Sequence, residues 1–234
     1  MGRKIHPLGF RLGVSQKHHS YWFANRKDYP NFLEEDRKIR NFVEKHIHKH
    51  GKIVSSYGGV GQIEIRRKTD LLQIAIQTGL PNLLIEEQNL SINDLKNDLV
   101  NILGIERKNL RIILTGVTQP HGEPKILAEN VASQIQGRVP FRRIMKKTIE
   151  LTGKRNGGGI RIQIAGRLNG SEMARVEWAR EGRVPLQTIK AKVNYCYHPT
   201  QTTCGVLGIK TWIFKDVSCD SFDEKQDISI LDKI

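Results

Sequence analysis

Residues 141–151 repeat their apolar and basic side chains with the period of an α-helix, so this segment must lay one side on a hydrophobic core. At roughly 100° per residue, one face collects Phe141, Ile144, Met145, Thr148, Ile149 and Leu151. The opposite face carries Arg142, Arg143, Lys146 and Lys147, and its only acidic residue is Glu150. The pattern predicts a helix that is buried on one side and strongly basic on the other.

The basic side of this helix indicates a polyanionic partner. Like charges four positions apart repel each other by a few tenths of a kcal/mol, and both Arg142/Lys146 and Arg143/Lys147 have this spacing. A helix that tolerates this repulsion favours an external polyanion, of which the phosphate backbone of a nucleic acid is the most common. The alternative is an ordinary solvated face, as most charge runs are.

The net charge of the chain favours the nucleic-acid interpretation. The 234 residues carry a formal net charge of +14, and the sequence pI is about 9.8. Residues 119–215 hold 17 Lys and Arg against 6 Asp and Glu, whereas residues 1–118 hold 19 against 12. The positive field therefore concentrates in the half that contains the basic helix. Residues 216–234 hold 2 against 6 and are predicted to be an acidic, unstructured tail.

Length and composition bound the class of protein. A chain of 234 residues with 38% hydrophobic residues can form two domains of about 100 residues each. It has no apolar run near the roughly 20 residues that cross a bilayer. Its first residues match neither a secretory signal nor an import helix, so we expect it to act where it is made. Three cysteines, which cannot all pair internally, fit a reducing compartment.

The first half is predicted to be a basic arm followed by a small α+β domain. Residues 1–30 are rich in Gly and His and weakly periodic, and we expect an extended arm that orders on a partner. Residues 31–118 are expected to form the domain, in the order helix, strand, strand, helix, strand. The expected helices cover 31–50 and 91–103, and the expected strands cover 62–67, 72–76 and 110–117.

The second half, residues 119–215, is predicted to be another α+β domain, with helices packed on a mostly antiparallel sheet. Residues 119–124 are interpreted as the hinge between the two domains. The expected helices are 124–135, 141–151 and 171–181, the expected strands are 160–165, 189–197 and 205–215, and a turn is expected at 156–159.

Motifs that would indicate an enzyme or a metal protein are weak. The glycine-rich residues 153–159 lack the glycine that a P-loop needs five residues before its Gly-Lys pair, because position 148 is Thr, so a flexible turn is favoured. No set of converging carboxylates, nucleophile with its base, or metal cage is recognisable. Two groups have some metal-ligand character but too few ligands, namely His46 with His50, and Cys196 with His198 and Cys204. We predict no catalytic residue, cofactor or metal.

The segment 175–188 is a second candidate for RNA contact. Arg175, Arg180 and Arg183 cluster in sequence around Trp178, and a guanidinium can bind phosphate in a bidentate manner or stack on a base. The alternative is that Trp178 belongs to the core and the arginines are ordinary surface residues.

Several long segments resemble one known family. They are MGRKIHPLGFRLG at 1–13, SYWFAN at 20–25, VPFRRIMKK at 139–147, the stretch 162–196, and GVLGIKTWIF at 205–214. Together they resemble small-subunit ribosomal protein three in its chloroplast form, from residue 1 to about residue 215. The resemblance implies a type II KH-like fold for residues 31–118 and an α+β fold of the family's own kind for residues 119–215.

The resemblance also implies a function. It implies a non-enzymatic component of the small-subunit head, made inside the plastid and acting in plastid ribosomes in the chloroplast stroma. The implied partners are ribosomal RNA, messenger RNA and the neighbouring small-subunit proteins ten and fourteen, with no membrane. The family's cations at the channel through which messenger RNA enters fall on Arg142, Arg143 and Lys146, and we include Lys147 from the same face. The predicted ribosomal RNA contacts are Arg3, Lys4, His6, Arg11, Arg167, Arg175, Arg180 and Arg183.

One departure from the KH pattern bears on this function. KH domains hold nucleic-acid backbone with a GxxG loop, and the corresponding residues here are Glu86, Glu87, Gln88 and Asn89. With carboxylates in place of glycines, the KH-like domain is predicted to act as a packing module. The stretch 52–61 has no clear counterpart in the family. Two other functions stay open, namely a metal-dependent nuclease that uses Glu172 or Glu177, and a free regulatory KH protein.

Overall fold

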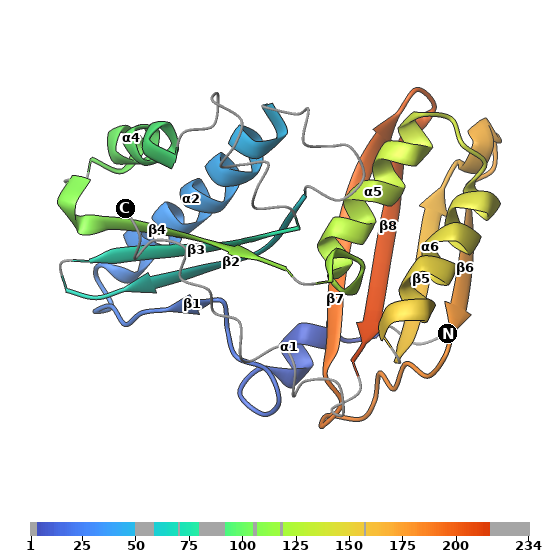
Figure 1. Cartoon of the computed structure of the whole chain (residues 1–234), viewed down its shortest axis with the longest axis horizontal. Helices are drawn as coiled ribbons and strands as arrows, with labels where there is room; N and C mark the ends of the chain where they lie inside the picture. The colour runs from blue at the N-terminus through green and yellow to red at the C-terminus, as the bar shows by residue number, and fades with distance from the viewer. Residues whose placement is uncertain are drawn as a thin grey trace. The chain divides into compact units, whose positions relative to one another are not determined.

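The computed structural model describes residues 4–49, 59–69, 71–79, 92–104, 107–117, 119–156 and 158–215 (Figure 1). They form two compact units. The first comprises residues 18–117, and in the second the described residues 4–17 join residues 119–215. Several features singled out above lie outside the described residues, namely Arg3, most of the stretch 52–61, the GxxG-equivalent residues 86–89 and the acidic tail 216–234.

The first unit is a four-stranded sheet with helices on one face. Strands β2 and β3 are antiparallel, whereas β1 pairs parallel with β2 and β4 pairs parallel with β3. In spatial order the strands are β1 (Ser20–Tyr21), β2 (Val60–Arg67), β3 (Leu72–Thr78) and β4 (Leu110–Gly116). The helices are α2 (Tyr29–Lys49) and α4 (Ile92–Leu103), and a 3-10 turn, η2 (Arg107–Asn109), precedes β4.

The core of the first unit follows from the alternation in its strands. Side chains two positions apart share a face, and the apolar ones of β2, β3 and β4 pack against the apolar stripes of α2 and α4. The buried residues include Ile39, Val43, Ile63, Ile65, Ile74, Ile76, Leu95, Leu99 and Ile112. The predicted hairpin, helices and last strand of residues 31–118 are confirmed in type and order.

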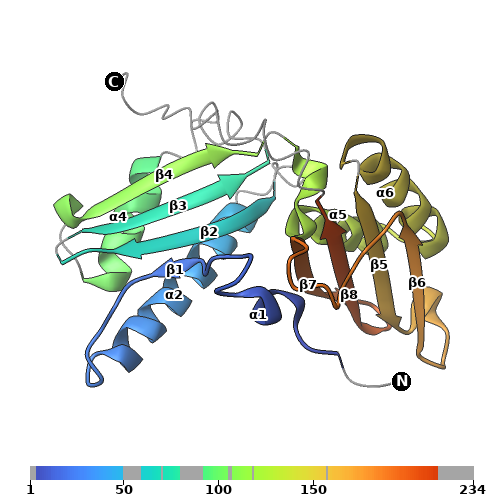
Figure 2. The ribbon, with the colours of Figure 1, turned by 90° about the horizontal axis from the view of Figure 1, so that it is seen from below.

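The second unit is an antiparallel four-stranded sheet covered on one face by two helices (Figure 1). The same helices lie on one side of the sheet when the ribbon is seen from below (Figure 2). In spatial order its strands are β6 (Arg175–Glu181), β5 (Gly159–Gly166), β8 (Gly205–Phe214) and β7 (Val193–Thr202). The covering helices are α5 (Pro124–Gln136) and α6 (Phe141–Asn156). The N-terminal helix α1 (Pro7–Arg11) packs against β7. Two 3-10 turns complete the unit, η3 (Pro120–Gly122) and η4 (Leu168–Gly170).

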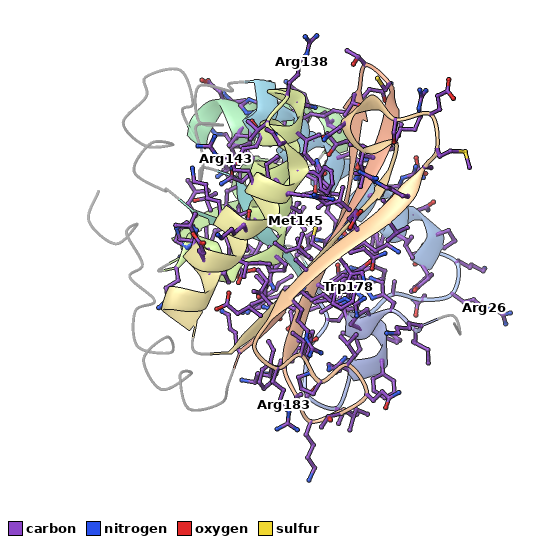
Figure 3. All side chains as sticks on the ribbon, turned by 90° about the vertical axis from the view of Figure 1, so that its right-hand side faces the viewer. Arg26, Arg138, Arg143, Met145, Trp178 and Arg183 are labelled. Atoms are coloured by element: carbon purple, nitrogen blue, oxygen red, sulfur yellow. The ribbon has the colours of Figure 1, made fainter. Side chains whose placement is uncertain are left out.

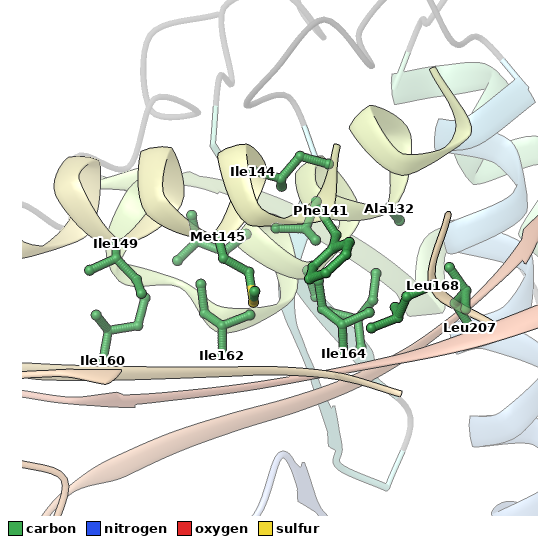
Figure 4. Close-up of a cluster of buried hydrophobic side chains, with 14 of the residues drawn as sticks. Ala132, Phe141, Ile144, Met145, Ile149, Ile160, Ile162, Ile164, Leu168 and Leu207 are labelled. Carbon is green, nitrogen blue, oxygen red and sulfur yellow. The ribbon is translucent and has the colours of Figure 1, made fainter. Parts of the chain in front are cut away.

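The apolar side of α6 forms the centre of the second core. Phe141, Ile144, Met145 and Ile149 are all buried, and they lie against the isoleucines of β5 (Figure 4). Those strand residues, Ile160, Ile162 and Ile164, are at most 1% exposed. The mixed α+β class and the mostly antiparallel second sheet are therefore confirmed.

Three local predictions are wrong. Residues 175–181 form the edge strand β6 rather than a helix, because Val176, Trp178 and Arg180 alternate along the antiparallel register with β5. Helix α6 continues to Asn156, five residues past its predicted end at residue 151 and into the glycine-rich stretch that was predicted to be a turn. Strand β7 begins at Val193 instead of residue 189, because the carbonyls of the preceding loop point to Arg11 rather than to a strand partner. The expected extended arm also contains α1 and β1.

Gly159 is required by a close approach of two backbone segments. A Cβ at this position would overlap the backbone carbonyl of Arg183. We expect Gly159→Ala to lower the free energy of unfolding of the second unit by roughly 1–3 kcal/mol, the usual cost of overpacking, measured by urea denaturation. The matched control is Gly9→Ala, whose new Cβ would meet only the His6 Cβ at 3.9 Å. Equal stability of the two variants would contradict this packing.

Candidate nucleic-acid interface

The predicted basic face of α6 is exposed along its whole length. We use the name "basic face" for Arg142, Arg143, Lys146 and Lys147, which are exposed, while Phe141, Ile144, Met145, Thr148 and Ile149 are buried. Arg143 lies on the outer side of the helix and Met145 on the side of the sheet (Figure 3). Among the described residues, no carboxylate is within ion-pair distance of these four cations. Their charge is therefore available to an external anion.

The underside of α6 fixes the orientation of the basic face. Its two buried hydroxyl groups are satisfied inside the helix, since Thr148 Oγ1 donates to the Ile144 carbonyl at 2.8 Å and Thr152 Oγ1 to the Thr148 carbonyl at 2.9 Å. Neither hydroxyl group therefore needs a hydrogen-bond partner on β5, and the apolar packing between α6 and β5 is undisturbed. Rotating the helix to turn its cations away would expose the buried apolar stripe, which costs about 25 cal/mol per Å².

Arg175 lies beside the first turn of the basic face. Its guanidinium carbon is 5.6 Å from the centroid of the Phe141 ring, and that of Arg142 is 5.8 Å from the same centroid. Both distances fall within the range of a cation–π contact. Arg175 Nε is also 3.6 Å from Glu177 Oε1, an exposed pair that screening by water makes weak. Arg175 therefore extends the basic face onto the edge of the sheet.

Strand β6 divides the predicted cluster around Trp178 between two faces of the sheet. Successive side chains of a strand point to opposite faces. Arg175 shares the helix-covered face with Ala179, which packs against the core, whereas Trp178 and Arg180 lie on the other face. The single arginine cluster expected around Trp178 is therefore wrong. The alternative that Trp178 is a core residue is also wrong, since the side chain is 58% exposed.

Arg11 is buried and cannot contact RNA from its observed position. Its exposed fraction is 0%, and its guanidinium converges on the loop before β7. Nε donates to the Ala191 carbonyl at 2.7 Å, and Nη2 donates at 3.0 Å to each of three carbonyls, those of Pro185, Leu186 and Thr188. Burial lowers the pKa of Arg11 from its usual value. The prediction that Arg11 contacts RNA is corrected: it joins α1 to the second unit.

The other predicted RNA contacts among the described residues are exposed. Lys4, Arg180 and Arg183 are solvent-accessible, and Arg183 projects outward in Figure 3. His6 is exposed, but its Nδ1 accepts the Gly9 N–H at 3.3 Å and so caps α1. Arg167 is exposed too, although Nε donates to the Ser171 carbonyl at 2.9 Å and Nη1 to the Cys204 carbonyl at 3.3 Å. His6 and Arg167 therefore also stabilise the backbone around them through these hydrogen bonds.

Three cations at the surface of the second unit were missed from the sequence, of which Arg161 and Lys210 are half-buried and Arg138 is exposed. Arg161 on β5 and Lys210 on β8 point to the face of the second sheet that the helices leave open, and Arg138 is exposed in the turn before α6. The signal for Arg161 and Lys210 was present, because both occupy strand positions opposite to the buried isoleucines.

The described residues contain no group of three or more His, Cys, Asp or Glu placed to hold a metal ion. His50, a member of one candidate pair, lies outside them. Glu177, proposed for a nuclease, lies beside Arg175 on the sheet. No helix in the same residues is long and apolar enough to span a bilayer.

A helix with one buried side and one uncompensated cationic side, carried on an α+β scaffold, is the electrostatic footprint of a nucleic-acid-binding protein. Comparison with known proteins identifies the family. Residues 131–213 match the family described as "Ribosomal protein S3, C-terminal domain". Small ribosomal subunit protein uS3c of Adiantum capillus-veneris is 76% identical over 216 residues, which cover 92% of this chain and 100% of the relative.

Other relatives agree over the same span. The proteins of the same name from Physcomitrium patens and Ginkgo biloba are 60% and 53% identical over 216 residues, which cover 92% of this chain and 99% of each relative. The chain therefore belongs to the S3 family of small ribosomal subunit proteins, in its chloroplast form. Members of this family are structural components of the ribosome, so the chain is not an enzyme, and the resemblance noted from the sequence is confirmed.

Proposed function

We propose that this chain is an RNA-binding component of the small-subunit head in stromal plastid ribosomes, and that the basic face of α6 lines the channel through which messenger RNA enters. The observation that carries the proposal is the exposure of Arg142, Arg143, Lys146 and Lys147 on a helix whose other side is buried. Ribosomal RNA is the main partner. The chain also contacts two neighbouring small-subunit proteins, numbers ten and fourteen.

The mechanism is electrostatic. Unpaired messenger strands expose phosphates that the basic face binds without reorganising, because the underside of α6 is already packed. Binding the unpaired strand stabilises it relative to the hairpin from which it came, since a ligand shifts an equilibrium by its differential affinity for the two states. The basic face thus favours unwound messenger at this position. Lys4, Arg167, Arg175, Arg180 and Arg183 are proposed to contact ribosomal RNA.

The proposal also assigns a separate role to each domain. We assign residues 31–118 to a type II KH-like packing module, residues 119–215 to the main RNA-binding domain, and residues 1–30 to a basic arm. The order helix, strand, strand, helix, strand in the first unit supports the KH-like assignment. The carboxylates at positions 86 and 87 argue against a phosphate clamp there.

The salt dependence of RNA binding tests the proposal. Neutralising all four cations of the basic face to Gln should make the slope of log affinity against log salt shallower by about 3 for single-stranded RNA, since each phosphate contact contributes about 0.7. Fluorescence anisotropy of a labelled, unstructured oligoribonucleotide measures this slope with the full chain.

The matched control keeps the charge and changes the side chain. Lys146→Arg combined with Lys147→Arg should leave the slope unchanged, because the number of phosphate contacts is the same. A neutral variant with the wild-type slope would contradict the proposed role of the basic face. Thermal unfolding of both variants should match that of the wild type, since all four residues are exposed.

A further inference from the structure

The face of the second sheet opposite to α5 and α6 has a composition that structural packing alone does not require. We call it the open face. It receives alternate residues from all four strands, and two cross-strand rows follow from the register: Trp178, Gln163, Lys210 and Tyr197 in one, and Arg180, Arg161, Trp212 and Tyr195 in the other. Each row crosses the sheet from β6 to β7. Aromatic rings and cations thus share one surface, and these two rows contain no carboxylate.

The aromatic side chains on the open face are unevenly buried. Trp212 is only 8% exposed and belongs to a small cluster with Ala191 and Val193. Trp178 and Tyr197 are 58% and 53% exposed. Large aromatic rings seldom stay this exposed without a partner, because each buries 150–250 Å² when packed, by rough estimate. Trp178 and Tyr197 are therefore candidates for a contact that completes the surface.

The cations of the open face are held against its rings. The Arg161 guanidinium carbon is 5.2 Å from the Trp178 ring centroid and 5.1 Å from that of Trp212, and Lys210 Nζ is 6.0 Å from the Tyr197 ring centroid. Arg161 Nε is buried and has no hydrogen-bond acceptor among the described residues. The guanidinium is thus positioned by stacking and not by an acceptor.

A groove adjoins the two rows. It has a volume of about 670 Å³ and is lined by the N-terminal segment, the loop before β7 and strands β7 and β8, including Lys4, Phe10, Tyr195, Lys210 and Trp212. Lys4 adds a further cation at its edge. Burial raises the pKa of Tyr195, so its hydroxyl stays protonated and adds no negative charge.

We propose that the open face binds unpaired nucleotides of ribosomal RNA by stacking bases on Trp178 and Tyr197, with Arg161 and Lys210 binding the phosphates between them. This inference deepens the proposed function and rests on it. Four-stranded antiparallel sheets with exposed aromatic side chains bind unpaired bases in this way, and stacking tolerates any base. Messenger RNA is the less suitable source, because the basic face that it would follow lies on the helix layer, on the other side of the sheet.

The test separates stacking from charge. Trp178→Ala combined with Tyr197→Ala, in the full chain, should weaken binding of a short unstructured oligoribonucleotide by roughly 25-fold or more, because stacking contributes about fivefold or more for each of the two bases. Binding of an abasic oligomer with the same phosphates should not change. Replacing Trp178 with Phe instead of Ala in this variant should recover most of the affinity lost at position 178, since an aromatic ring is retained.

The control is Val176→Ala, on the same strand and the same face. Val176 is 56% exposed and has no ring, so its truncation should leave both affinities unchanged. Unchanged oligoribonucleotide binding by the double variant would overturn the inference, as would equal losses for the normal and abasic oligomers. If the wild-type chain binds neither oligomer, the proposed function itself fails.

The source of the nucleotides is tested in assembled subunits. In small subunits without messenger RNA, the double variant should increase the reactivity of a few ribosomal RNA bases toward a base-specific probe, relative to wild type and Val176→Ala. Bases that become reactive only in subunits programmed with messenger would contradict ribosomal RNA as the source. An unchanged reactivity pattern would overturn the site altogether.

Discussion

Replacing Arg11 with Ala should destabilise the second unit by roughly 3–5 kcal/mol, the cost of leaving several buried carbonyls without their donor. The side chain is fully buried, and it donates to carbonyls of residues 7, 185, 186, 188 and 191. Without it, several of these carbonyls lose their donor, and an unsatisfied buried polar group costs about 1–3 kcal/mol. Urea denaturation, with hydrogen exchange of β7 and β8 amides to locate the loss, measures the effect.

The matched control for this prediction is Lys4→Ala, which removes an exposed cation from the same N-terminal segment. It should change the free energy of unfolding by less than about 0.5 kcal/mol. A direct RNA contact by Arg11 makes the opposite prediction, namely weaker RNA binding with stability retained. Such a result would contradict the structural role of this residue.

Arg142→Ala combined with Arg143→Ala should leave subunit assembly intact while slowing translation through stable hairpins. Both side chains are exposed and unpaired among the described residues, so their truncation does not disturb the core. Each lost exposed charge contact is worth about 0.2–1 kcal/mol. Because about 1.36 kcal/mol is tenfold in rate, losing two contacts should slow passage through a hairpin by roughly two- to thirtyfold, measured as translation time on matched messages.

An unstructured message of equal length is the control for the hairpin message. Its translation time should be the same for wild-type and variant ribosomes, because no strand separation is required. Sedimentation should place both chains with small subunits in equal amounts. Equal slowing on both messages would indicate a general defect and would contradict a specific action on paired messenger.

The basic face could be predicted from the sequence because a helix period is a local property. Each of the residues 141–150 has the burial that the pattern predicts, with Thr148 on the buried side. The hairpin of the first unit was equally local, since β2 and β3 are joined by a short connection. Such elements need no knowledge of distant partners.

Strand β6 and the role of Arg11 could not be predicted in the same way. The alternating Arg and Glu of residues 175–181 imitate the ion pairs of a helix, and only the ladder with β5 selects the strand. Arg11 stands in a basic, glycine-rich segment that resembles an RNA-binding arm. Its partners are 174 to 180 residues away in sequence, so the convergence of their carbonyls is visible only in the folded chain.

Photo-cross-linking of messenger RNA to the assembled plastid ribosome tests the central claim most directly. A messenger with thiouridine placed downstream of the decoding site should cross-link to the peptide that spans residues 141–156, and Arg142→Ala with Arg143→Ala should reduce the yield. Messenger that cross-links to neighbouring proteins or ribosomal RNA from every downstream position, and never to this helix, would contradict the account.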